Sequence, residues 1–191
     1  MLPQSSNPLA WRVFADTCVV NRVVDFGEYF FDNYLGGAAL AEYEGRSPED
    51  QADIEALHDI LMVYQRTCMP LYVTETVLKE VAAATRADLA SYVWEVFDHW
   101  RSWGDPQLWK RCSSPSFARE AHELAATLTA FGDEADRLLV AEAITVGCDV
   151  FLTVDRKSLW SRRDQIEPAS IRILRPVELW AALCPWVRIV S

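Results

Sequence analysis

Short apolar runs that alternate with longer segments of helical periodicity constrain the fold of this chain more than any other feature. Residues 149–153 (DVFLT) are too few and too apolar for anything but a buried strand. Similar short runs cover residues 11–15, 70–73 and 171–174. Helical segments separate these runs, which is typical of βαβ units. The predicted fold class is therefore α/β, with a mostly parallel central sheet of about four to five strands.

Periodic apolar positions and capping residues define the helices between the runs. Over residues 18–34 apolar side chains recur every three or four positions, and Gly36-Gly37 offers a stop. Ser47 can cap a helix that has Pro48 at its first position and continues to about residue 66. Further helices are expected over residues 74–81, 86–103, 117–128, 134–146 and 176–183, with a helical turn at 157–160 and a long loop at 104–116.

Length and charge limit the classes of protein that fit. The chain has 191 residues, of which 51% are hydrophobic, so we expect a single domain with a sizeable core. Its 18 basic and 28 acidic side chains give a net charge of -10, which argues against a protein that coats nucleic acid non-specifically. Seven basic and only three acidic residues follow Asp155, so a contact with phosphates would be confined to that segment.

The cysteines and the N-terminal segment predict the cellular compartment of the protein. The five cysteines are scattered and form no C-x-x-C pair, so we expect reduced thiols and neither a disulfide framework nor a zinc ribbon. Residues 1–10 lack the basic and apolar regions of a signal peptide, and no apolar run approaches roughly 18 residues. The expectation is a cytoplasmic protein with no membrane partner.

Four carboxylates are predicted to meet at one edge of the sheet. Asp16 and Asp155 directly follow strands, and open parallel sheets bind ligands beyond the carboxyl ends of their strands. Glu80 lies in the second turn of the helix that follows the second strand. Asp136 is in the first turn of the helix before the third strand. Because that helix must run antiparallel to the strand, it returns Asp136 to the same edge.

Converging carboxylates raise one another's pKa, and a divalent cation is the common resolution. Hard oxygen ligands without His or Cys suit Mg²⁺ or Mn²⁺ and disfavour Zn²⁺. Such ions assist the hydrolysis of phosphodiester bonds. Each acid alone could instead be a helix cap or a solvated turn residue, so the prediction of a metal site depends on all four.

Five motifs that carry these acids span nearly the whole chain. They are FADT at 14–17, VTETVLKEV at 73–81, DRLLVAEA at 136–143, CDVFLTVD at 148–155 and IRILRPVEL at 171–179. In content and order they resemble the PIN domain nuclease family. The resemblance implies a three-layer α/β/α fold and a Mg²⁺- or Mn²⁺-dependent endoribonuclease that hydrolyses single-stranded RNA. It also implies that Asp16, Glu80, Asp136 and Asp155 are the catalytic, metal-holding residues.

The resemblance also bears on partners and domain organisation. Many small bacterial members are toxins that an antitoxin holds inactive, so it implies RNA as substrate and allows an antitoxin partner or a homodimer. The chain is longer than the compact toxins, and we expect a single PIN-like domain over residues 1–191 with helical insertions around 35–66 and 86–116. The family commonly has a polar residue two positions after the first Asp, where this chain has Cys18.

Three residues beside the acids are predicted to bind substrate. Thr153 matches the family's T-x-D motif and could orient Asp16 or a substrate phosphate, although a Thr in a buried strand is often only packed. Arg156 and Lys157 begin a basic cluster, continued by arginines at 162 and 163, that could hold phosphates. A solvated charged face is the alternative for this cluster.

Further acids and aromatic residues have competing interpretations. Glu75 rivals Glu80, although the helix dipole favours a first-turn Glu in any helix. Asp133 is either an N-cap or an additional acid of the metal site. Glu142 is expected to face away from the site as a solvated surface charge. The Trp-rich stretch 92–109 could stack unpaired bases, pack in the core or form a protein interface.

Two other functions stay open. One is a catalytically silent PIN-like module that binds a protein partner, which the acidic overall surface and Cys18 favour. The other is a nuclease of the same fold that acts on structured DNA. Cleavage assays on RNA and on flap DNA would separate both from a ribonuclease.

Overall fold

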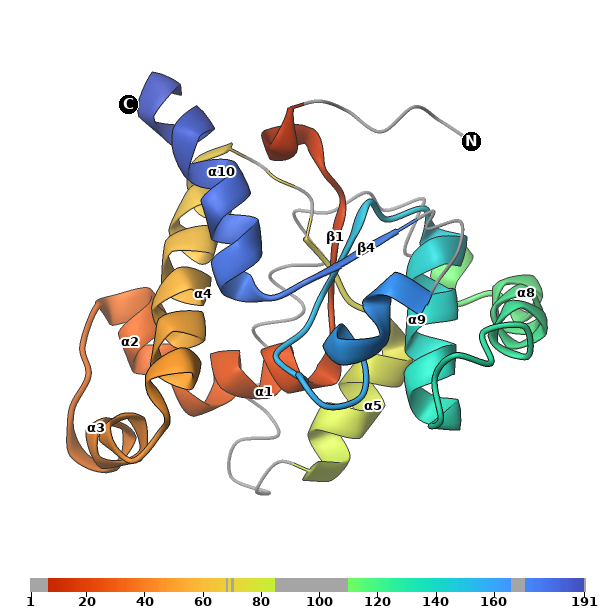
Figure 1. Cartoon of the computed structure of the whole chain (residues 1–191), viewed down its shortest axis with the longest axis horizontal. Helices are drawn as coiled ribbons and strands as arrows, with labels where there is room; N and C mark the ends of the chain where they lie inside the picture. Colours follow the sequence, from red (N-terminus) through yellow and green to blue (C-terminus); the bar gives the residue numbers. More distant parts are fainter. Residues whose placement is uncertain (1–6, 68, 70, 85–109, 166–170, 191) are drawn as a thin grey trace.

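The computed structural model describes residues 7–67, 69, 71–84, 110–165 and 171–190 (Figure 1). Four strands form one sheet in the order β2-β1-β3-β4, and every neighbouring pair is parallel. The strands are β1 Val13–Ala15, β2 Leu71–Tyr72, β3 Val150–Leu152 and β4 Arg172–Leu174. Each strand lies within one of the four predicted runs, which confirms the α/β class and the parallel sheet.

Helices connect the strands and cover the sheet. Figure 1 shows α4 and α10 on one side of the sheet and α8 and α9 on the other, an arrangement compatible with a three-layer α/β/α sandwich. No described helix combines the length and the apolar character needed to cross a membrane. The helices are η1 Pro8–Ala10, α1 Thr17–Asp25, α2 Gly27–Asp32, α3 Gly37–Glu44, α4 Pro48–Thr67, α5 Glu75–Ala84, α8 Pro115–Ala125, α9 Glu134–Val146, η2 Trp160–Gln165 and α10 Pro176–Val190.

The two central strands form the middle of the hydrophobic core. All residues of β1 and β3 are buried, and the rings of Phe14 and Phe151 stack with centroids 5.4 Å apart. Strands covered on both faces are continuously apolar, so polar side chains occur only beyond the strand ends. Strand β1 leads into helix α1, and strand β2 leads into helix α5. The two helices contact each other beside the carboxyl edge of the sheet.

Capping residues set the helix boundaries as the sequence predicts. The Ser47 hydroxyl accepts a hydrogen bond from the backbone N–H of Asp50 at the start of α4. The Asp133 carboxylate accepts from the N–H of Ala135 at 2.9 Å, so Asp133 is the N-cap of α9. Gly147 ends α9 in the left-handed conformation, with φ at 84°, which favours glycine.

The N-terminal helices differ from the prediction. The expected helix over residues 18–34 is two helices, because the backbone at Phe26 leaves the helical conformation between α1 and α2. The apolar periodicity continues across this break, since Phe26 and Phe30 are both buried. The Gly36-Gly37 pair does not only stop a helix: α3 begins at Gly37. None of its residues is buried, and it lies within the range 35–66 for which only a helical insertion without bounds was expected.

The C-terminal elements also correct the prediction. Helix α10 continues beyond the expected end at residue 183 and runs through Pro185. Proline removes the hydrogen bond to the carbonyl of Ala181, but both residues are exposed and water can satisfy that carbonyl. The expected turn at 157–160 is followed by η2. The predicted helix over 86–103 and the Trp-rich stretch lie outside the described residues.

Candidate functional site

The four predicted acids all lie at the carboxyl edge of the sheet. Asp16 follows β1 and Asp155 comes three residues after β3, whereas Glu80 and Asp136 reach the edge from α5 and α9. Their proximity is visible in the electrostatics of Asp136. Burial raises the pKa of this carboxyl against the opposing effect of a hydrogen bond with Ser158, and repulsion from Asp133, Asp155 and Glu80 raises it further. The topology therefore brings together side chains that are far apart in the sequence.

Asp16 is the most buried of the four, and three hydrogen bonds hold its carboxylate. Its Oδ1 accepts from the N–H of Thr17 at 2.7 Å, and its Oδ2 accepts from Thr153 Oγ1 at 2.7 Å and from Cys18 Sγ at 2.8 Å. Burial raises the pKa of Asp16 to about 6, against the opposing effect of these bonds and with a contribution from Asp136. Thr153 thus orients Asp16, as the sequence suggested, and Cys18 acts as a second donor.

Glu80 is connected to Asp16 through one intervening residue. The hydroxyl of Thr17 donates to Glu80 Oε2 at 2.6 Å, which joins the first turn of α1 to α5. Glu75, its rival, is exposed and forms an ion pair with Lys79 on the same helix. Of the two candidate acids on α5, the structure therefore directs Glu80 to the sheet edge.

The Asp155 carboxylate accepts hydrogen bonds from residues of the turn that follows it. Its Oδ1 accepts from the backbone N–H groups of Lys157 at 2.7 Å and Ser158 at 3.1 Å, and its Oδ2 accepts from the Ser158 hydroxyl. Burial raises the pKa of Asp155, but these hydrogen bonds outweigh it and the net pKa lies below its ordinary value. Its backbone N–H also donates to Thr153 Oγ1 at 3.0 Å, so Thr153 connects Asp155 to Asp16.

The acids are neighbours, but they do not form a coordination sphere. In the part of the chain that the structure describes, no group of three or more His, Cys, Asp and Glu side chains is arranged to hold a metal ion. Within the same residues, no ion pair joins any of the four acids to a basic side chain. The oxygen donors of the four acids match the chemistry of Mg²⁺ and Mn²⁺.

Glu142 is not a solvated surface charge, and that prediction is wrong. Its side chain is buried, and it accepts from the hydroxyls of Thr74 and Thr76, each at 2.5 Å. Burial raises its pKa, and repulsion from Glu80 contributes. A signal was present in the sequence: Leu139 and Val146, three residues before and four after, are apolar and mark the buried face of α9.

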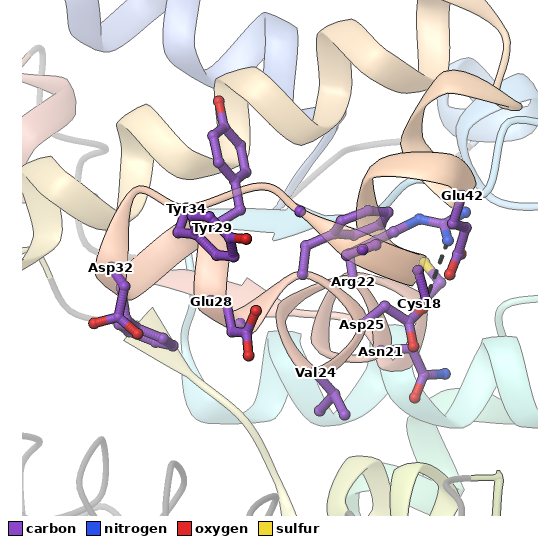
Figure 2. A pocket seen from close by; sticks show the side chains of 17 residues that line it. Cys18, Asn21, Arg22, Val24, Asp25, Glu28, Tyr29, Asp32, Tyr34 and Glu42 are labelled. Atoms are coloured by element: carbon purple, nitrogen blue, oxygen red, sulfur yellow. Dashed lines mark ion pairs between the residues drawn. The ribbon is translucent and has the colours of Figure 1, made fainter.

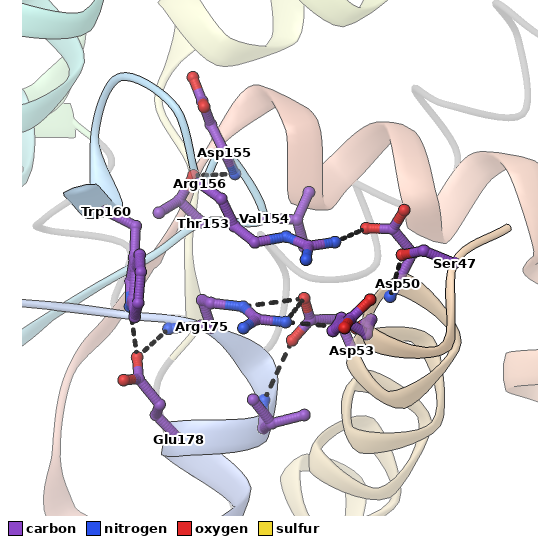
Figure 3. Close-up of polar contacts among 12 residues, drawn as sticks. Ser47, Asp50, Asp53, Thr153, Val154, Asp155, Arg156, Trp160, Arg175 and Glu178 are labelled. Atoms are coloured by element: carbon purple, nitrogen blue, oxygen red, sulfur yellow. Dashed lines mark hydrogen bonds and ion pairs between the residues drawn. The ribbon is translucent and has the colours of Figure 1, made fainter.

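The basic side chains after Asp155 are largely engaged within the protein. Arg156 and Lys157, the two predicted phosphate contacts, differ in this respect. Figure 3 shows Arg156 reaching to Asp50 on α4, with which it forms an ion pair. The side chain of Lys157 is exposed and lies close enough to lower the pKa of Asp155. The two further arginines also have partners: Arg162 donates to the carbonyl of Ala130 and Arg163 pairs with Glu178.

A pocket of about 1170 Å³ opens beside Cys18 along helices α1, α2 and α3 (Figure 2). Its charged lining is mainly acidic, with one arginine, Arg22, against Asp25, Glu28, Asp32 and Glu42. Such a lining repels phosphate groups. A polyanion is therefore disfavoured in this pocket.

The comparisons with known proteins give no family. No protein-family model matches the chain, and neither a curated protein nor a solved structure does. The PIN-like assignment therefore stays a prediction that depends on the five sequence motifs and on the position of the four acids.

Proposed function

We propose that this protein is a PIN-type endoribonuclease that hydrolyses phosphodiester bonds in single-stranded RNA and uses Mg²⁺ or Mn²⁺. The observation that supports the proposal most directly is the position of four carboxylates, from four separate elements, near the carboxyl edge of a parallel sheet. Ligands of open α/β sheets bind at that edge. The residues that would hold the cation are Asp16, Glu80, Asp136 and Asp155.

The surrounding residues fix these carboxylates in place. A divalent cation would supply Lewis-acid activation of the phosphate and of the attacking water. Thr153 holds the Oδ2 atom of Asp16, and Thr17 holds Glu80. The exposed amine of Lys157, next to Asp155, is available for a phosphate oxygen. The toxin role and an antitoxin partner would follow from the family resemblance alone.

A catalytically silent binding module is the second candidate, and the hydrogen bonds of Asp155 favour it. Three donors from its own turn occupy the two oxygens of this carboxylate, as they would in an ordinary turn cap. The acidic pocket beside Cys18 would then serve a protein partner. A module of this kind needs none of the four carboxylates for catalysis.

Cleavage of RNA by matched variants tests the proposal. Wild type, Asp16→Asn and Asp155→Asn would be incubated with a set of unstructured RNAs in Mn²⁺, and with flap DNA in parallel. We expect cleavage of RNA by wild type and a loss of at least about 100-fold in each variant, because each substitution removes a charged metal ligand. Asp164→Asn is the matched control, since the Asp164 side chain is 97% exposed.

The outcomes separate the candidates. Preferred cleavage of flap DNA would indicate a structure-specific DNA nuclease. Equal inertness of wild type and variants on all RNAs, with no Mn²⁺ bound, would remove the nuclease proposal and leave the binding module. Equal activity of wild type and both variants would show that neither Asp16 nor Asp155 takes part in the cleavage, which would contradict the proposed metal site.

A further inference from the structure

The buried carboxylate of Glu142 joins two helices that carry acids of the candidate site. Glu142 is on α9 and is only 5% exposed. Its Oε2 accepts from Thr74 Oγ1 and its Oε1 accepts from Thr76 Oγ1. Thr74 is the residue whose carbonyl receives the first helical hydrogen bond of α5, from the N–H of Leu78. Glu142 therefore binds the beginning of α5 with both of its oxygens.

The contact of Glu142 with Thr74 and Thr76 lies on the same two helices as Asp136 and Glu80, two acids of the candidate site. Asp136 precedes Glu142 by six residues on α9, and Glu80 follows Thr74 by six residues on α5. Six residues of helix correspond to about 9 Å, so each acid lies about two turns from the contact. Glu80 and Asp136 are close enough to repel each other. The contact therefore constrains the two helices at a point near the pair of acids that they present.

Stability does not explain a carboxylate at this position. Burial of a charged group costs free energy, and a well-packed apolar residue in its place is often neutral or stabilising. Repulsion from Glu80 adds to that cost. The remaining consequence of the contact is geometric, because two hydroxyl donors on one carboxylate fix both the separation and the rotation of α5 relative to α9.

We propose that Glu142 is a positioning residue, which holds the start of α5 against α9 so that Glu80 faces Asp136. This inference deepens the proposed function, because the pair that Glu142 positions would hold the cation. Replacement by Gln retains the shape of the side chain, but leaves one acceptor oxygen for two hydroxyl donors. Glu142→Gln should therefore loosen α5 without creating a cavity.

The experiment compares Glu142→Gln and Thr76→Val with three reference variants. Thr76→Ser keeps the hydroxyl and should behave as wild type. Thr145→Val removes a hydroxyl on α9 that donates only within its own helix, to the carbonyl of Ala141. Glu123→Gln removes an exposed charge on α8. Each protein would be measured for Mn²⁺ affinity by calorimetry, for amide hydrogen exchange in α5, and for melting temperature.

We expect the Kd for Mn²⁺ to rise about tenfold in Glu142→Gln and Thr76→Val, as for other residues that orient a metal ligand. Amide exchange in α5 should be faster in these two variants, and the melting temperature should fall by only a few degrees, because each variant loses one buried hydrogen bond. The three reference variants should match wild type in all measurements. A rise in Kd that Thr76→Ser also shows would contradict a role of the hydroxyl.

The inference and the proposed function fail in different ways. If wild type binds Mn²⁺ and Glu142→Gln binds it equally well with unchanged exchange in α5, Glu142 does not position Glu80. If wild type binds no Mn²⁺, the proposed function fails. Faster exchange in α5 of the variants would then still support the contact as a brace, whereas unchanged exchange would overturn the inference as well.

Discussion

At the scale of single residues, Asp16 shows most clearly that this edge of the sheet is not arranged for stability. Its carboxylate is 4% exposed, is held by three donors and has no basic partner among the described residues. Burial of a carboxylate without a basic partner costs free energy, and natural proteins tolerate that cost chiefly at functional sites. The sequence predicted the position of Asp16 from the strand that precedes it. It marked Cys18 only as an exception to the family pattern, although the contact is local: Cys18 donates to the Oδ2 atom of Asp16, two residues earlier.

The pKa of Asp16 gives a testable dependence of stability on pH. Burial raises this pKa from 3.8 to about 6, so the folded protein takes up a proton as the pH falls below about 6, before the unfolded chain does. The associated stabilisation is complete below pH 3.8 and is lost as the pH rises through about 6. In EDTA, the titration of Asp16 alone should make the free energy of unfolding about 1 kcal/mol larger at pH 5 than at pH 7.

Denaturant unfolding at several pH values measures this difference, and Asp16→Asn is the variant to compare. The substitution removes the titrating carboxyl, so the rise in stability between about pH 7 and 5 should shrink by about 1 kcal/mol. An unchanged pH dependence in Asp16→Asn would mean that Asp16 titrates normally. Other carboxyls with raised pKa values, such as Asp136 and Glu142, would still contribute to the slope in the variant.

At the scale of elements, α9 contains both the most and the least predictable features of the molecule. Its N-cap Asp133 and its C-cap Gly147 follow from local backbone chemistry, so the sequence suffices to find them. The burial of Glu142 depends on two hydroxyls from α5, 66 and 68 positions away in the chain. Local patterns contain no such partner, although the apolar residues around Glu142 indicate its buried face.

Substitutions of Asp133 distinguish its role as the N-cap of α9 from a role in the metal site. Asp133→Ala should lower the free energy of unfolding by about 1 kcal/mol, because the N–H of Ala135 loses its acceptor. Asp133→Ser should restore most of that loss, since a hydroxyl caps a helix nearly as well. Urea denaturation measures both. A loss of Mn²⁺ affinity in Asp133→Ser at restored stability would instead make Asp133 an acid of the metal site.

A buried ion pair joins α4 to the start of α10. Asp53 is 2% exposed and accepts from the Nη2 and Nε atoms of Arg175 at 2.6 and 3.1 Å (Figure 3). Asp53→Ala leaves the arginine without its partner and should lower the free energy of unfolding by about 3 kcal/mol.

Asp50→Ala is the matched control on the same helix, because the side chains of Asp50 and Arg156 are 33% and 31% exposed. Solvent screens such a pair, so its removal should cost less than about 1 kcal/mol. Chemical denaturation of the two variants checks the difference. Equal and small losses would show that Asp53 contributes little to the packing of α4 against α10.

At the scale of the whole molecule, the net charge of -10 and the basic C-terminal segment have to be considered together. The sequence predicted that segment as a local phosphate contact. The structure engages Arg156 with Asp50, which is 106 residues away and therefore invisible to any local pattern. Lys157 is left exposed beside Asp155. The α/β fold was predictable because each strand and cap is local, whereas the distribution of free and paired charge was not.

If RNA is the substrate, as proposed, the net charge of -10 would make the metal site the main point of attachment for its phosphates. Binding of Mn²⁺ therefore tests the central claim most directly, by calorimetric titration of wild type, Asp136→Asn and the control Asp164→Asn near neutral pH. Asp136 lies close enough to Asp16, Glu80 and Asp155 to repel each of them, and Asp133 repels it as well. We expect saturable Mn²⁺ binding by wild type and Asp164→Asn, with a Kd at least about tenfold weaker in Asp136→Asn. Equal affinity in all three proteins, or no saturable binding by wild type, would contradict a metal site built from these carboxylates.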